Sequence, residues 1–123
     1  MKISISSRIS EYSNDKTKSF INTEDFVNLA IKNNFNGVSL RPAMVSTEST
    51  ENKINKTSKI FRDNKICVSM ITSNIHLAKN DELASQTLRN ITPTLDLAEK
   101  LRTSLIRIMI KKMEDRFYAK KAL

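Results

Sequence analysis

The chain has 123 residues, 39% of them hydrophobic, with one cysteine and a formal net charge of +8. This length is enough for one domain and too short for two. It contains no apolar run near the roughly 20 residues of a membrane span, and its first ten residues lack the apolar segment of a secretory signal. A single cysteine excludes an internal disulfide and is typical of a reducing compartment. We therefore expect a cytoplasmic protein with no membrane partner.

The positive charge is spread along the chain. Lysines such as Lys53, Lys56 and Lys59 are scattered among Asn, Ser and Thr. A positive excess can indicate nucleic acid, an anionic membrane or an anionic small ligand, but it is only the first feature that a nucleic-acid surface requires. We interpret the charge as a bias of the whole composition, and we do not expect a nucleic-acid partner.

The first third of the chain predicts a strand, a loop and a helix. Residues 2–7 alternate apolar and polar side chains, which is the period of a strand. The polar residues 8–18 predict a loop. Thr23 is a good N-cap for a helix, and the segment 33–37, rich in Asn and ending in Gly, provides residues that tolerate the left-handed backbone at the end of a helix.

The next segments repeat this order. Residues 37–42 alternate again, with Val38 and Leu40 on one face, Ser39 and Arg41 on the other, and a proline at the end. Thr50 or Asn52 is expected to cap a second helix that ends near residues 63–64. Residues 66–71 form an apolar run typical of a strand covered on both sides, closed by residues 72–74. Cys67 within it is expected to be a buried structural thiol.

The last third predicts a longer helix and a fourth strand. The apolar positions Leu83, Leu88, Leu95 and Leu101 mark one face of a helix that begins near residue 81, and Pro93 is expected to kink or divide it. Residues 105–111 then alternate strictly. Three isoleucines lie on one face, and the other face carries the following side chains: Arg107, Met109 and Lys111.

Strands that alternate with helices predict a parallel sheet with right-handed crossovers. An open doubly wound sheet has helices on both faces, so both faces of its strands are apolar. Here the second and fourth strands have one apolar and one polar face, as in a barrel with a polar interior. We therefore predict an α/β fold, a partial (β/α)8 TIM barrel of about four βα units. The alternative is that Arg107 is a solvated cation on an edge strand.

Four motifs in this order resemble the sugar phosphate isomerase/epimerase family of the xylose-isomerase-like TIM barrel superfamily. They are residues 23–26 (Thr-Glu-Asp-Phe), 37–41 (Gly-Val-Ser-Leu-Arg), 96–101 (Asp-Leu-Ala-Glu-Lys-Leu) and 106–108 (Ile-Arg-Ile). The resemblance covers about residues 1–112, which would be the N-terminal half of the barrel domain. Residues 113–123 are expected to form a basic tail with a partial helix.

The chain departs from that family at several positions. Ser39 stands where many relatives have Glu, and Arg102 stands where Gly is usual after the fourth helix. The resemblance implies eight βα units and a divalent metal (Mn, Mg or Zn) held mostly by later strands, beyond Leu123. His76, the sole histidine, has no clustered partner, so we assign no metal ligand and no catalytic residue to this chain. We expect a missing C-terminal half or a homo-oligomer partner.

Polar side chains at the strand ends are the candidate substrate-binding residues. Arg41 can clamp a phosphate or carboxylate bidentately, and Lys111 acts as a point charge. Neutral side chains supply further hydrogen bonds, and the full set is Ser6, Arg41, Ser73, Asn74 and Lys111. The alternative is that Arg41 and Arg107 pair with acidic residues of the absent half. The loop carboxylates are expected to be solvated: Glu11, Glu48 and Glu51.

The resemblance implies a sugar (phosphate) isomerase or epimerase of carbohydrate metabolism, metal-dependent when complete and present here as a fragment. Two alternatives remain open. One is a fragment of an apurinic-site DNA repair enzyme of the endonuclease IV type, and the other is a non-catalytic remnant.

Overall fold

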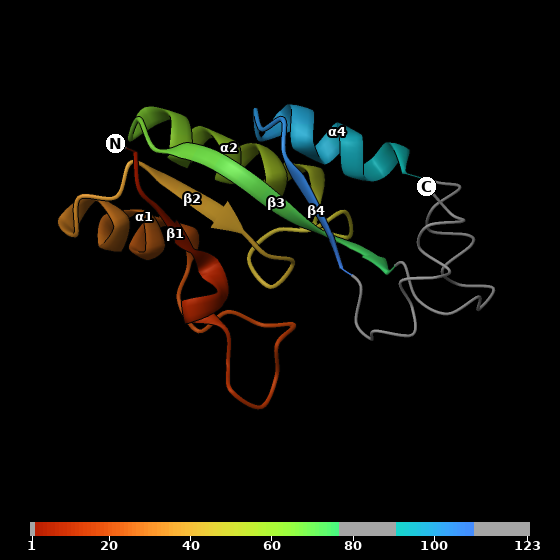
Figure 1. The fold of residues 1–123 in the computed structure, drawn as a ribbon, viewed down its shortest axis with the longest axis horizontal. Coiled ribbons are helices and arrows are strands. Elements are labelled where there is room, and N and C mark those ends of the chain that lie inside the picture. Colours follow the sequence, from red (N-terminus) through yellow and green to blue (C-terminus); the bar gives the residue numbers. More distant parts are fainter. Residues whose placement is uncertain (1, 77–90, 110–123) are drawn as a thin grey trace.

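The computed structural model describes residues 2–76 and 91–109. Four parallel strands form one sheet in chain order, and Figure 1 shows them side by side: β1 (Ser4–Ser6), β2 (Gly37–Leu40), β3 (Cys67–His76) and β4 (Ile106–Met109). A doubly wound sheet reverses its strand order at a switch point. The uninterrupted order β1-β2-β3-β4 instead matches successive staves of a barrel.

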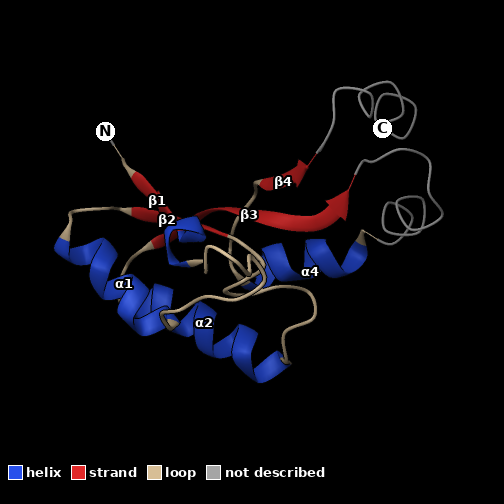
Figure 2. Ribbon diagram, turned by 90° about the horizontal axis from the view of Figure 1, so that it is seen from below, coloured by secondary structure: helices blue, strands red, loops and turns tan. Residues whose placement is uncertain are grey.

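The α-helices all cover one face of this sheet. They are α1 (Thr23–Lys32), α2 (Glu51–Asp63) and α4 (Thr92–Lys100), and a short 3₁₀ helix, η1 (Ser7–Ser10), follows β1. Figure 2 shows the three α-helices on the same side of the strands. In the described part of the chain the opposite face carries no α-helix. The predicted fold class, part of a (β/α)8 barrel, is therefore confirmed.

The hydrophobic core lies between the sheet and the helices. Alternate residues of the strands point into it, as the sequence pattern predicts, and the largest fully buried apolar side chains come from α1, α2 and β2: Phe26, Val27, Phe61, Val38 and Leu40. Each large apolar side chain buried in this way stabilises the fold by roughly 1.5–3 kcal/mol.

The strand register places three polar residues in one row on the open face. Leu40 pairs with Ile71, and Ile71 pairs with Ile106, so these apolar residues share the helix-covered face. The residue that follows each of them points the other way. Arg41, Thr72 and Arg107 therefore lie side by side on the face that would line a barrel.

The strands differ from prediction in two ways. β3 continues to His76, because Thr72 and His76 pair with Arg107 and Met109 of β4, whereas residues 72–74 were predicted to close it. The prediction that this strand is covered on both sides is wrong at Cys67, which is exposed on the open face and is not a buried thiol.

The helix ends are also refined by the structure. Asn22, not Thr23, caps α1, since its side chain accepts a hydrogen bond from the Asp25 N–H at 2.8 Å. Thr50 caps α2, as predicted. Pro93 lies in the first turn of α4, where a missing N–H costs little.

The predicted apolar stripe of the last helix is only partly buried. Leu97, Ala98 and Leu101 lie in the core, but Leu95 is 49% exposed, so its assignment to the buried face is wrong. Other predicted features lie outside the described residues: helical residues 81–90, the strand end 110–111 and the tail 113–123.

Candidate functional site

The C-terminal end of β1 is joined to that of β2 by side chains of η1. The Ser6 hydroxyl accepts a hydrogen bond from the Arg8 N–H at 3.3 Å and so begins η1. The next residue, Ser7, is buried, and its hydroxyl accepts a bond from the Arg41 N–H at 2.9 Å. This contact holds the chain after β1 against the point where β2 ends. In TIM barrels the active site forms at this end of the strands.

An ion pair between Arg41 and Glu11 completes the connection. The Arg41 Nε lies 2.5 Å from the Glu11 Oε1, and the two side chains are 16% and 1% exposed. The prediction that Glu11 is solvated is therefore wrong. The partner of Arg41 in the described structure belongs to this chain, whereas the alternative interpretation placed such acids in an absent half.

Backbone contacts hold Glu11 in place. Glu11 and Ser19 form an antiparallel bridge, and the N–H of Phe20 donates to the Ser10 carbonyl at 2.8 Å. The residues between the bridged positions project as the loop that follows η1 in Figure 1. This bridge turns the Glu11 side chain inward, which no local pattern in residues 8–18 indicated.

Two buried oxygen atoms near this point have no hydrogen-bond partner within the described residues. They are the Glu11 Oε2 and the Thr72 Oγ1. Buried polar atoms are nearly always bonded, and an unbonded one costs roughly 1–3 kcal/mol. These two atoms are therefore candidates for hydrogen bonds to a ligand.

The other predicted site residues have different positions. Ser73 is buried, and its hydroxyl donates to the Arg107 carbonyl at 3.2 Å. By alternation it falls on the face of Ile71, toward the helices. Asn74 belongs to β3, while Lys111 lies outside the described residues. Among the described residues, Arg41 is contacted by Ser7 and Glu11 and not by the predicted Ser6, and the binding roles of all five residues stay predictions.

An exposed aromatic pair borders the same end of the sheet. The rings of Tyr12 and Phe20 meet edge to face with their centroids 5.8 Å apart, and both side chains remain about half exposed. Ligand sites commonly combine such apolar surfaces with a few oriented polar groups. No local sequence pattern indicated this pair, because its members are brought together by the Glu11–Ser19 bridge.

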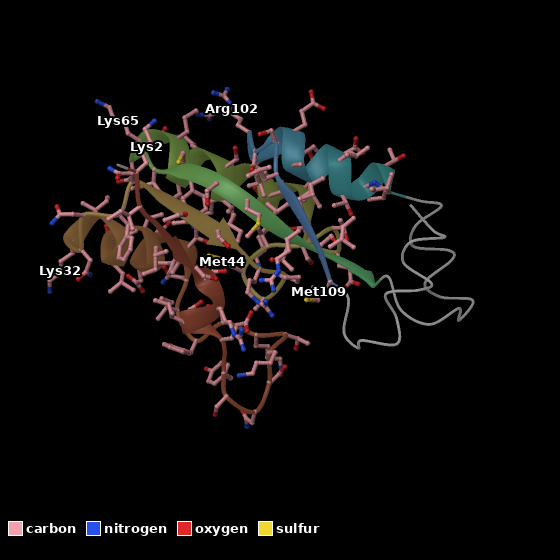
Figure 3. All side chains as sticks on the ribbon, in the orientation of Figure 1. Lys2, Lys32, Met44, Lys65, Arg102 and Met109 are labelled. Atoms are coloured by element: carbon pink, nitrogen blue, oxygen red, sulfur yellow. The ribbon has the colours of Figure 1, made fainter. Side chains whose placement is uncertain are left out.

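A pocket of about 180 Å³ lies at the opposite end of the sheet, between the start of β3, α2 and the turn after α4. Its lining includes Phe61, Arg62, Cys67 and Arg102. Figure 3 shows Lys65 and Arg102 at this end, whereas Met109 lies at the other end of the strands. This volume is below that of ordinary ligand pockets, and residues at the amino-terminal end of a barrel serve stability.

The described residues do not fit a divalent metal. No three His, Cys, Asp or Glu side chains come together among residues 2–76 and 91–109. Divalent metal sites in proteins need several such ligands. We therefore derive no chemical step through a metal from this chain.

Comparison with known proteins is informative for the fold. No protein-family model matches the chain, and no curated protein matches it significantly. Among solved structures it is similar to the probable 3-DHS dehydratase AsbF, involved in petrobactin synthesis, from Bacillus anthracis, with a TM-score of 0.67 and 18% identity. The match covers 98% of this chain and 45% of that chain, so this chain spans less than half the length of that protein.

At this identity the likeness shows the fold alone, that of part of a TIM barrel. It agrees with the uninterrupted strand order and with the helices on one face. None of the described helices is long and apolar enough to cross a bilayer.

Proposed function

We propose that this chain is the N-terminal half of a xylose-isomerase-like barrel and that it binds a small sugar or sugar phosphate at the C-terminal ends of its strands. The observation that carries the proposal is the half-buried Arg41, held by Glu11 at the end of β2 on the open face. The exposed ring pair of Tyr12 and Phe20 borders the same end. Barrel enzymes keep their substrates at this end.

The reaction we propose for the complete barrel is isomerisation or epimerisation. A divalent metal would polarise the sugar oxygens there, with its ligands on the other half, because the described residues do not supply them. The contribution of this chain is binding: Arg41 and its neighbours hold polar groups of the substrate. The solved relative is described as a 3-DHS dehydratase, so 3-DHS is included among the ligands to be tested.

A missing half is the partner that the sheet would accept. Within the described residues β1 and β4 each pair on one side only. Unpaired strand edges recruit other strands, and further βα units, on the same or another polypeptide, would add strands at both edges. The DNA repair alternative has less support, because the lysines and arginines are scattered along the sequence and net positive charge is only the first feature that a nucleic-acid surface requires.

Titration of the ¹⁵N-labelled chain tests the proposed binding. D-xylose, D-glucose 6-phosphate and 3-DHS are added separately to millimolar concentration, and backbone amide shifts are followed. We expect shifts at Ser7, Arg41 and Thr72, and none at Arg102, which lines the pocket at the opposite end. An unchanged spectrum with all three ligands would contradict the proposal.

A pair of arginine variants provides the matched control. Arg41→Lys keeps the charge beside Glu11 but loses the planar donor fork, so we expect ligand affinity to fall severalfold. Arg62→Lys makes the same change at the opposite end of the sheet, where affinity is expected to stay at the wild-type value. An equal loss of ligand affinity in both variants would show that the ligand does not bind specifically at Arg41.

A further inference from the structure

The Glu11 carboxylate uses only one of its two oxygens. Oε1 binds the Nε of Arg41, while Oε2 is buried and has no hydrogen-bond partner among the described residues. A carboxylate has room for about four hydrogen bonds, so this group keeps acceptor capacity at a position closed to bulk water. The Arg41 side chain beside it is 16% exposed and so reaches the surface.

Thr72 provides a second unused oxygen, on the strand next to Arg41. The register Leu40–Ile71 places Arg41 and Thr72 next to each other on adjacent strands, which are roughly 4.8 Å apart. The Thr72 hydroxyl is buried and, within the described residues, unbonded. Only the Nε of Arg41 has a side-chain partner in that part of the chain. Unused donors of Arg41 and an unused oxygen of Thr72 therefore belong to neighbouring positions, Arg41 just after β2 and Thr72 within β3.

The net charge of the Glu11–Arg41 pair determines which ligand groups it would bind. Glu11 neutralises Arg41, so the pair carries no net charge, and a phosphate would meet a carboxylate beside the guanidinium. A hydroxyl has no such penalty, because it donates to the carboxylate oxygen and accepts from the guanidinium N–H.

We propose that Glu11, Arg41 and Thr72 form a subsite for neutral hydroxyl groups, taking adjacent hydroxyls of a polyhydroxylated ligand. One hydroxyl donates to the Glu11 Oε2, and its neighbour accepts from Arg41 and bonds with the Thr72 hydroxyl. This inference rests on the proposed sugar binding and deepens it: the subsite recognises the hydroxyl end of the ligand and not a phosphate.

The decisive variant is Glu11→Gln. The amide oxygen of Gln still accepts from the Arg41 Nε, but the second position becomes an N–H₂ donor and can no longer accept from a hydroxyl. A lost hydrogen bond to a charged group is worth roughly tenfold or more in affinity. We expect the Kd for D-xylose to rise about tenfold and the affinity for inorganic phosphate to increase, since the repelling carboxylate is gone.

Two further variants keep the test interpretable. Glu24→Gln removes an exposed carboxylate on α1 that pairs with Lys56, and it should leave both affinities unchanged. Thr72→Val removes only the unbonded hydroxyl at nearly constant shape, so we expect the variant to fold. D-xylose binding to it should weaken severalfold. This variant therefore tests the subsite even if the Glu11→Gln variant does not fold.

The outcomes separate the two proposals. If the wild-type chain binds D-xylose and neither the Gln nor the Val variant weakens it, the hydroxyl subsite is wrong while sugar binding stands. The subsite is also wrong if inorganic phosphate binds the wild-type chain more tightly than D-xylose with shifts at Arg41. If the wild-type chain binds none of D-xylose, D-glucose 6-phosphate and 3-DHS, both proposals fail.

Discussion

Thr72 shows how a single side chain can lower the stability of the fold while serving a site. Its hydroxyl is buried without a hydrogen-bond partner in the described structure, although the residue pairs normally with Arg107 in the sheet. Valine has nearly the same shape and keeps the β-branched preference for strands. In the absence of ligand, the unbonded Thr72 hydroxyl therefore lowers the free energy of unfolding, and a ligand that bonds with it would remove this penalty.

Replacing Thr72 with valine should raise the free energy of unfolding by about 1 kcal/mol, because the desolvation cost of the unbonded hydroxyl disappears. Urea denaturation followed by circular dichroism measures this change. Thr57→Val, at another buried threonine but on α2, is the comparison variant. A loss of stability in the Thr72 variant would mean that its hydroxyl is bonded.

Glu51 offers a pH-dependent prediction at the same scale. The Lys100 ammonium lies 2.7 Å from its carboxylate and lowers the pKa of Glu51 below the ordinary glutamate value, chiefly through their hydrogen bond. A lowered pKa in the folded state adds stability above the unfolded-state pKa, and this contribution is lost as pH falls from the ordinary glutamate pKa through the lower folded-state pKa.

We expect the Lys100→Gln variant to bring the Glu51 pKa back toward its ordinary value and to lose less stability than the wild type as pH falls from 5 to 3. Carboxyl-carbon NMR titration reads the pKa directly. Lys59→Gln breaks a different helix pair, with Asp63, and should not move Glu51. An unchanged Glu51 pKa in the Lys100 variant would show that the pair does not form in solution.

At the scale of elements, the same helix ending occurs three times. Asn34, Lys65 and Arg102 follow α1, α2 and α4, and each has a left-handed backbone with φ of 59°, 56° and 55°. After each of them, the next N–H bonds back to a carbonyl five residues earlier: Phe35 to Ala30, Ile66 to Phe61 and Thr103 to Ala98. These are Schellman endings, in which glycine is preferred because it adopts this backbone without strain.

Lys65→Gly should therefore raise the free energy of unfolding by about 1 kcal/mol, since the left-handed strain of a residue with Cβ is removed. Arg62→Gly removes the same charge three residues earlier, inside α2, and should lower stability by about 1 kcal/mol. Thermal and urea denaturation of both variants measure the two changes. If both glycine variants lower the free energy of unfolding equally, Lys65 does not have a left-handed backbone in solution.

These endings explain what the sequence pattern could and could not predict. The residue at Arg102 was identified as a position where relatives carry Gly, and its left-handed backbone is the physical reason. The segment 33–37 was predicted to supply the left-handed residue after α1, and Asn34 does so. Gly37 does not: its φ is not positive, and a Cβ there would lie 2.7 Å from the Cys67 Sγ. Such a close approach between strands has no signature in the local sequence.

At the scale of the whole molecule, the periodicity of the strands predicted the parallel sheet and its two unlike faces. The site was harder to predict, because Glu11 and Arg41 are 30 residues apart and meet only through η1 and the Glu11–Ser19 bridge. Composition favours a solvated glutamate in such a polar loop, and only the folded chain turns this one inward. The sequence correctly directed attention to Arg41 at the end of a strand, but it did not reveal Glu11 as the partner of Arg41.

The central claim is that this sheet is one half of a barrel, with strand edges at β1 and β4 that pair on one side only in the described structure. Sedimentation equilibrium of the purified chain over a range of concentrations tests it most directly. We predict reversible association to a dimer or larger species, because the open edges and polar face need cover. A monodisperse 14.0 kDa monomer at every concentration would contradict the claim.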